Sequence, residues 1–77
     1  MSLKKMRNKK GLSQSQLAKA TNIPLSTIIK YEDNYANINR AKLENLLKIS
    51  IVLGCRIEDI ITEDSLKEMI SKYNKER

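Results

Sequence analysis

The segment from Leu12 to Tyr31 constrains the fold of this chain more than any other part of the sequence. It predicts two short helices joined by a tight turn, with a cap at Ser13 and the turn at Asn22. Its apolar residues recur where two crossed helices touch each other. The residues expected inside are Leu17, Ala18, Ile23, Ile28 and Tyr31. Those expected outside are Gln14, Pro24, Leu25, Ser26, Ile29 and Lys30.

The composition favours one small, all-helical domain. A chain of 77 residues has room for a single small core. Three Tyr are its only aromatic residues, so this core must be aliphatic. Only two Gly and one Pro interrupt a sequence rich in good helix formers. The fold class expected from these observations is all-α.

The first half of the chain divides into three predicted helices. The first covers Leu3 to Lys10, and Gly11 follows it where a left-handed backbone is needed. The second begins at Ser13, because Ser13 and Gln16 have the spacing of a capping box. The third runs from Pro24 to Asp33, since proline is well tolerated in a first helical turn.

The second half predicts three more helices after a loop at Tyr35 to Ile38. Asn39 is the expected cap of a fourth helix, Arg40 to Leu53, and Gly54 is expected to end it. Its expected inner face carries Leu43, Leu46, Leu47, Ser50 and Leu53, with Ile49 at the margin. A short fifth helix is expected at Ile57, Ile60 and Ile61. A final amphipathic helix, capped by Thr62 or Asp64, carries Leu66, Met69, Ile70 and Tyr73 on one side.

The net charge of +6 points to an anionic partner. Nucleic acid is the first candidate and an anionic membrane the second, while ordinary solubility is the alternative explanation. The longest uncharged run, Ile49 to Cys55, is too short to span a bilayer. No secretory signal precedes the first basic cluster. We therefore expect a cytoplasmic protein with no membrane partner.

The residue types available argue against enzymatic activity. One Cys and no His leave neither a usual zinc site, nor an internal disulfide, nor a Cys–His nucleophile pair. Cys55 lies among apolar residues, which favours a small buried role over a reactive one. No glycine-rich phosphate loop is present either. We expect no catalytic residue, no metal, no cofactor and no small-molecule substrate.

Several short motifs in order resemble one family. The matching pieces are Leu3-x-x-Met6-Arg7, Gly11-Leu12-Ser13-Gln14, Leu17-Ala18, Ser26-Thr27-Ile28, Tyr31-Glu32, Leu46-x-x-Ile49, Leu53-Gly54 and Ile57-x-x-Ile60. Together they resemble the Cro/repressor-type helix-turn-helix domain, or XRE family, over about Leu3 to Ile61. The resemblance implies a five-helix, lambda-repressor-like DNA-binding domain at residues 1–61. Residues 62–77 would form an additional C-terminal helix.

Three positions depart from the family pattern. Asn22 stands where the turn usually has Gly, and Pro24 stands where a Ser or Thr cap is common. The loop after the third helix, residues 32–35, lacks the usual Gly and Pro. These departures concern the phosphate contacts of the loop more than the fold.

The resemblance implies a transcriptional regulator, repressor-like, that inserts the helix around residues 24–33 into the major groove of double-stranded DNA. Leu25, Ser26, Ile29 and Lys30 fall where family members contact bases. Lys30 suits guanine, Ser26 several bases, and Leu25 or Ile29 a thymine methyl. Gln14 falls where a side chain holds the DNA backbone. Arg7 and Glu32 fall on a pair that commonly forms a structural ion pair.

Further contacts to the DNA backbone are expected from helix starts and nearby polar side chains. Those residues are Ser13, Lys10, Thr27, Tyr35, Asn37, Arg40 and Lys42. The basic run of the first helix is not assigned to base contact, because in family members it lies on the far side from the recognition helix.

Two alternatives stay open at this point. Leu25, Ile29 and the last helix could instead contact a protein partner, as in an antitoxin or a protein that sequesters another regulator. The stripe Leu66, Met69, Ile70 and Tyr73 has two interpretations of its own, as a closing layer of the core or as the seam of a homodimer.

Overall fold

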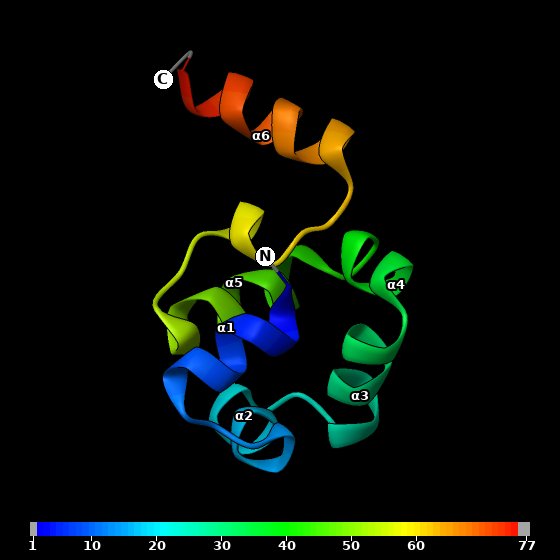
Figure 1. Ribbon diagram of the computed structural model, residues 1–77, viewed down its shortest axis with the longest axis vertical. Coiled ribbons are helices and arrows are strands. Elements are labelled where there is room, and N and C mark those ends of the chain that lie inside the picture. The colour runs from blue at the N-terminus through cyan, green and yellow to red at the C-terminus, as the bar shows by residue number, and fades with distance from the viewer. Residues whose placement is uncertain (1, 76–77) are drawn as a thin grey trace.

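The computed structural model describes residues 2–75, without the side chains of Tyr35 and Ala36. The described part is all-helical and has no strand, which confirms the predicted fold class. Its helices are α1 (Leu3–Lys10), α2 (Gln14–Thr21), α3 (Leu25–Asp33), α4 (Tyr35–Asn39), α5 (Leu43–Leu53) and α6 (Asp64–Lys75). One turn of 3-10 helix, η1 (Ile57–Asp59), precedes α6. Helices α1 to α5 gather around one centre, whereas α6 lies at one end of the molecule (Figure 1).

Left-handed residues end three of the helices, as the sequence predicts. Gly11, Asn22 and Gly54 have φ angles of 79°, 58° and 63° and follow α1, α2 and α5. The capping box of α2 is also confirmed. Ser13 Oγ accepts the Gln16 N–H at 3.0 Å, and Gln16 Oε1 accepts the Ser13 N–H at 2.8 Å. These local signals position the turn between α2 and α3.

The core is aliphatic and draws on almost every element. Its five fully buried large side chains are Leu17, Ile28, Ile38, Ile49 and Ile60. They come from α2, α3, α4, α5 and the residue after η1. Leu3 adds a buried side chain from α1. Helix α6 contributes no buried residue, so the core is complete in the first 61 residues.

The predicted loop at Tyr35 to Ile38 is wrong, because the structure has the short helix α4 there. No Gly or Pro stops the backbone from making a further turn, and that turn carries Ile38 into the core. Asn39 consequently ends α4 instead of capping the next helix. Helix α5 begins only at Leu43, with Lys42 in the cap position.

The predicted inner face of α5 is partly wrong. Ile49, placed at the margin, is 0% exposed, whereas Leu43 is 64% exposed and Leu47 is also exposed. The face that packs inward consists of Leu46, Ile49, Ser50 and Leu53. Apolar residues occupy most of the circumference of this helix, so periodicity alone could not select the buried side.

The C-terminal part differs from the prediction in one respect. The expected fifth helix is only the single turn η1, after which Ile60 and Ile61 are buried. Helix α6 follows and contacts η1, and Leu66 packs against the edge of the core. Within residues 2–75, no helix is both long and apolar enough to cross a membrane.

Candidate nucleic-acid interface

Helices α2 and α3 form a compact pair joined by the short turn from Asn22 to Pro24. Ile23 in that turn is buried, which ties the turn to the core. Pro24 precedes the first residue of α3, and its carbonyl accepts the N–H groups of Thr27 and Ile28 at 3.0 and 3.2 Å. The missing N–H of proline therefore costs nothing at this helix start. No side chain caps α3.

The outer face of α3 carries the four predicted base-contacting residues. Leu25, Ser26 and Lys30 are exposed, and Ile29 is half-buried at the margin. On the opposite face, Ile28 and Tyr31 are buried. A ligand approaching α3 thus meets two apolar side chains, one hydroxyl and one ammonium group.

A buried ion pair fixes α3 against the preceding helices. Arg7 Nε donates to Glu32 Oε2 at 2.6 Å and its NH2 group donates to Glu32 Oε1 at 2.9 Å. The two side chains are only 9% and 2% exposed. Arg7 also donates to the Leu12 carbonyl at 2.8 Å. The hydrogen bond to Glu32 raises the pKa of the Arg7 guanidinium, so Arg7 stays charged.

Gln14 joins the same network from the start of α2. Its Nε2 donates to Glu32 Oε1 at 3.1 Å, which couples α2 to the end of α3. The sequence assigned Gln14 to the DNA backbone and did not foresee this bond. An amide nitrogen carries two hydrogens, so one donor is left for a further acceptor.

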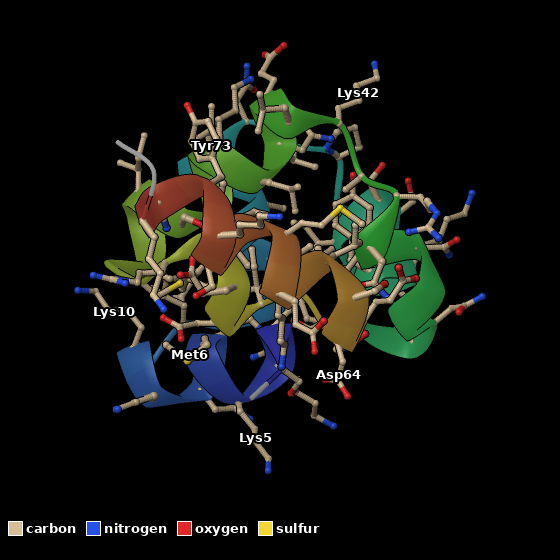
Figure 2. The ribbon with its side chains drawn as sticks, turned by 90° about the horizontal axis from the view of Figure 1, so that it is seen from above. Lys5, Met6, Lys10, Lys42, Asp64 and Tyr73 are labelled. Atoms are coloured by element: carbon tan, nitrogen blue, oxygen red, sulfur yellow. The ribbon has the colours of Figure 1, made fainter. Side chains whose placement is uncertain are left out.

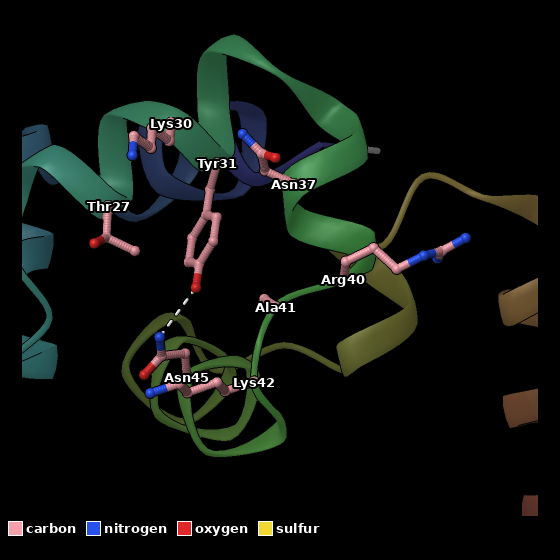
Figure 3. A pocket seen from close by; sticks show the side chains of 8 residues that line it. All are labelled: Thr27, Lys30, Tyr31, Asn37, Arg40, Ala41, Lys42 and Asn45. Atoms are coloured by element: carbon pink, nitrogen blue, oxygen red, sulfur yellow. Dashed lines mark hydrogen bonds between the residues drawn. The ribbon is translucent and has the colours of Figure 1, made fainter.

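A cationic pocket of about 480 Å³ lies between α3, α4 and the start of α5 (Figure 3). Lys30 and Thr27 line one wall, and Lys42 and Asn45 line another. At its centre Asn45 Nδ2 donates to Tyr31 Oη at 3.0 Å. The full lining is Thr27, Lys30, Tyr31, Asn37, Arg40, Ala41, Lys42 and Asn45. The first amides of α5 border this pocket and add the positive end of a helix dipole.

The pairing of α2 with α3 agrees with the result of comparing the sequence with models of known protein families. A family model described as helix-turn-helix matches residues 3–60. The chain belongs to the Cro/repressor-type helix-turn-helix family. Domains of this family are DNA-binding regulatory domains. No curated protein and no solved structure matches the chain.

The pocket gathers four of the eight residues that the sequence predicts to contact the DNA backbone. Thr27, Asn37, Arg40 and Lys42 all line the pocket, and Lys30 connects it to the outer face of α3. Ser13 lies apart at the start of α2, where its hydroxyl serves the capping box. The side chain of Tyr35 lies outside the described residues.

Arg40 is oriented differently from its predicted role. Its NH2 group lies 3.1 Å from Glu63 Oε1, and Figure 3 shows the guanidinium pointing away from the pocket. Glu63 belongs to the segment before α6, which sequence reasoning did not connect with this helix-turn-helix surface. Lys30 and Lys42 are consequently the side chains best placed to meet an anion in the pocket.

The basic residues of α1 are separate from this pocket. Figure 2 shows Lys5 and Lys10 extending from α1, on sides of the molecule away from Lys42. Sequence reasoning also missed Asn45, which lines the pocket and holds Tyr31. No local signal marks Asn45, because its role depends on how α5 packs against α3.

Proposed function

We propose that this protein is a sequence-specific transcriptional regulator of the repressor type, which inserts α3 into the major groove of an operator. The observation that carries the proposal is the position of the cationic pocket directly beside the exposed face of α3. Phosphates flank a DNA groove on both sides, so a base-reading helix needs cationic and amide donors next to it. Regulation by occupancy of DNA requires binding and no chemical step.

Base recognition would come from the outer face of α3. The Lys30 ammonium can donate to guanine O6 and N7, and the Ser26 hydroxyl can serve several bases. Leu25 and Ile29 can pack against the methyl group of thymine. The exposure of Leu25, Ser26 and Lys30 supports these assignments.

Backbone contacts would come from the pocket and from the two helix starts beside α3. Lys42, Asn37 and Thr27 would approach one phosphate together with the first amides of α5. Gln14 and the amides following Ser13 would approach another at the start of α2. The partly buried hydrogen bond between Gln14 and Glu32 supports this assignment, because it fixes the orientation of the Gln14 side chain.

The test is selection of bound duplexes from a random pool, followed by binding isotherms for the selected duplex and for random DNA. We expect the selected duplex to bind roughly 10³-fold or more tightly. Affinity for both should fall steeply with added salt, because phosphate contacts release counterions. Equal affinity for selected and random duplexes at every salt concentration contradicts the proposal.

A second candidate function is a protein-interaction module on the same fold, for example an antitoxin. The exposed Leu25 at the start of α3 favours it, since an apolar side chain can meet a protein as well as a thymine methyl. In that case α6 would belong to the same contact surface. Affinity capture of a tight partner whose binding survives both Leu25→Asp and Met69→Asp counts against this version.

A further inference from the structure

A second cationic surface lies on α1, and the proposed function does not use it. Helix α1 carries five basic residues and no acidic one. Arg7 is held in the buried ion pair with Glu32, whereas the four lysines of the helix are exposed. These lysines are Lys4, Lys5, Lys9 and Lys10. The ion pairs found within residues 2–75 include none of the four, so their charges are available to an external partner.

A small pocket, called the α1 pocket below, opens where the C-terminal ends of α1 and α5 meet. It has a volume of about 260 Å³ and is lined by Met6, Lys9, Lys10, Leu53 and Gly54. Met6 is half-buried against the core and Leu53 is buried, which gives the α1 pocket an apolar base. Lys9 and Lys10 follow Met6 by three and four residues, so they lie on the same side of α1 as Met6. Their exposed ammonium groups make the edge of the pocket cationic.

The two helix ends also place hydrogen-bond acceptors beside the α1 pocket. The last four carbonyl groups of a helix have no partner within the helix. The N–H groups that follow each helix satisfy the earlier two of these four, which are the carbonyls of Arg7 and Asn8 in α1 and of Ser50 and Ile51 in α5. This pattern leaves the last two carbonyls of each helix, and three of those four belong to pocket residues, namely Lys9, Lys10 and Leu53.

We propose that the α1 pocket binds an acidic protein segment that inserts one large aliphatic side chain. The carboxylates of the segment pair with Lys9 and Lys10, and the aliphatic side chain packs on Met6 and Leu53. Backbone N–H groups of the segment donate to the carbonyls at the helix ends. Pockets that enclose a whole small molecule measure about 300–1,000 Å³, so a pocket of about 260 Å³ suits a single side chain better.

The same features favour a protein segment over a second nucleic-acid duplex. A phosphate backbone could use the lysines, but it has no apolar group for the base of the pocket and no donor for the carbonyls. Figure 2 shows Lys10 extending from α1 on a side of the molecule away from Lys42. A duplex held by α3 and the cationic pocket therefore leaves the α1 pocket open. The inference does not rest on the proposed function, since this surface is separate from the recognition helix.

The test uses two synthetic peptides and the full chain labelled with ¹⁵N. In the first peptide glutamates flank one central leucine, and in the second an alanine replaces the leucine. Amide chemical shifts of the protein are followed during titration with each peptide. We expect the leucine peptide to bind about tenfold more tightly, because its side chain leaves water for the apolar base. The shift differences between the two peptides should concentrate at Met6, Lys9, Lys10, Leu53 and Gly54.

Charge-reversed variants test the cationic edge of the pocket. The double variant Lys9→Glu, Lys10→Glu should weaken binding of the leucine peptide at least about tenfold, because like charges then face each other. Lys72→Glu, Lys75→Glu is the matched control: it makes the same change of charge on α6, which does not line the α1 pocket, and should affect binding far less. All four lysines are exposed, so thermal melting should show both double variants to be folded.

Three results would overturn the proposal. The first is equal affinity of the two peptides, which would reduce the interaction to diffuse charge attraction. The second is a set of leucine-dependent shifts at Lys30 and Lys42 in place of the α1 pocket. Random duplex DNA serves as the third probe: if Lys9→Glu, Lys10→Glu weakens its binding as much as Lys42→Ala does, α1 contacts nucleic acid instead. The peptide results need no DNA, so they stay decisive even if no operator is found.

Discussion

Asn39 and Thr62, 23 residues apart in the sequence, hold each other through two hydrogen bonds between the end of α4 and the segment that leads to α6. Asn39 Nδ2 donates to Thr62 Oγ1 at 3.0 Å, and Asn39 Oδ1 accepts the Thr62 N–H at 2.9 Å. The same oxygen accepts the Glu63 N–H at 3.1 Å. One amide side chain thus fixes where the polypeptide leaves the core.

Asn39→Ala should lower the free energy of unfolding by about 1–3 kcal/mol, because it leaves partly buried backbone N–H groups without their acceptor. Urea denaturation followed by circular dichroism measures this change. Asn37→Ala on the same helix is the matched control and should stay within about 0.5 kcal/mol, since Asn37 is exposed. Equal stability losses in the two variants count against a special role for Asn39.

Removing one partner of the Arg7–Glu32 pair should be costly. Either single substitution, Glu32→Leu or Arg7→Leu, is expected to lower the free energy of unfolding by about 3–5 kcal/mol, because the remaining charge stays buried without its partner. The double variant Arg7→Leu, Glu32→Leu should cost clearly less than the sum of the two single losses. Thermal or urea unfolding of all three variants gives the coupling energy.

The exposed pair of Lys48 and Glu44 is the control for that measurement. Lys48→Ala should change stability far less than either single substitution at the buried pair, as is usual for an exposed i,i+4 pair. Additive losses at Arg7 and Glu32, with no coupling, contradict the structural role of the buried pair.

Asn22 has a positive φ of 58°, which alanine adopts only at a cost. Asn22→Ala should therefore lower stability by about 1 kcal/mol, whereas Asn22→Gly should preserve or increase it. Differential scanning calorimetry compares the two melting temperatures. A melting temperature for the alanine variant at or above that of the glycine variant argues against strain at this turn.

Acid should weaken the protein through two glutamates, Glu44 and Glu63. Hydrogen bonding from Lys48 lowers the pKa of Glu44 below its ordinary 4.5, and hydrogen bonding from Ser65, assisted by the charge of Arg40, lowers the pKa of Glu63. A carboxylate with a lowered pKa in the folded state stabilises the fold above 4.5 and loses that contribution as the pH falls through the lowered value. We expect the urea midpoint of unfolding to decline between about pH 7 and about pH 3. The decline should be smaller in a Glu44→Gln, Glu63→Gln double variant than in the wild-type protein. An identical decline in both proteins rejects this assignment.

Lys42 and Lys5 are expected to differ in DNA binding although they carry the same charge. Lys42→Ala should weaken binding to operator and random duplex alike and reduce the salt slope by about 1, because a phosphate contact is lost. Lys5→Ala, on α1 away from Lys42, should change binding far less. Lys30→Ala should instead weaken the binding free energy for the operator by about 1–3 kcal/mol and relax the base preference at one base pair. Fluorescence anisotropy over a salt series distinguishes these three responses, and equal effects of Lys42→Ala and Lys5→Ala oppose the assignment of the pocket.

Local signals were sufficient for the start of α2 and for the C-terminal ends of α1, α2 and α5. The capping box at Ser13 and the left-handed residues Gly11, Asn22 and Gly54 act through neighbouring backbone groups, so a single sequence reveals them. The family match over residues 3–60 agrees with the motifs read from the same region. The roles of Leu25, Ser26, Ile29 and Lys30 in reading DNA stay predictions.

The sequence by itself determined the all-helical class, the α2–α3 pair and the family, because helix periodicity and caps depend on residues a few positions apart. Only the tertiary structure decided that α4 replaces a loop, that Ile49 is buried while Leu43 is exposed, and that Arg40 turns to Glu63. Each of those outcomes depends on residues distant in sequence competing for the same core or the same charge. A local sequence pattern carries no information about which of these distant residues reaches the core or the charged partner. Tertiary packing decides it.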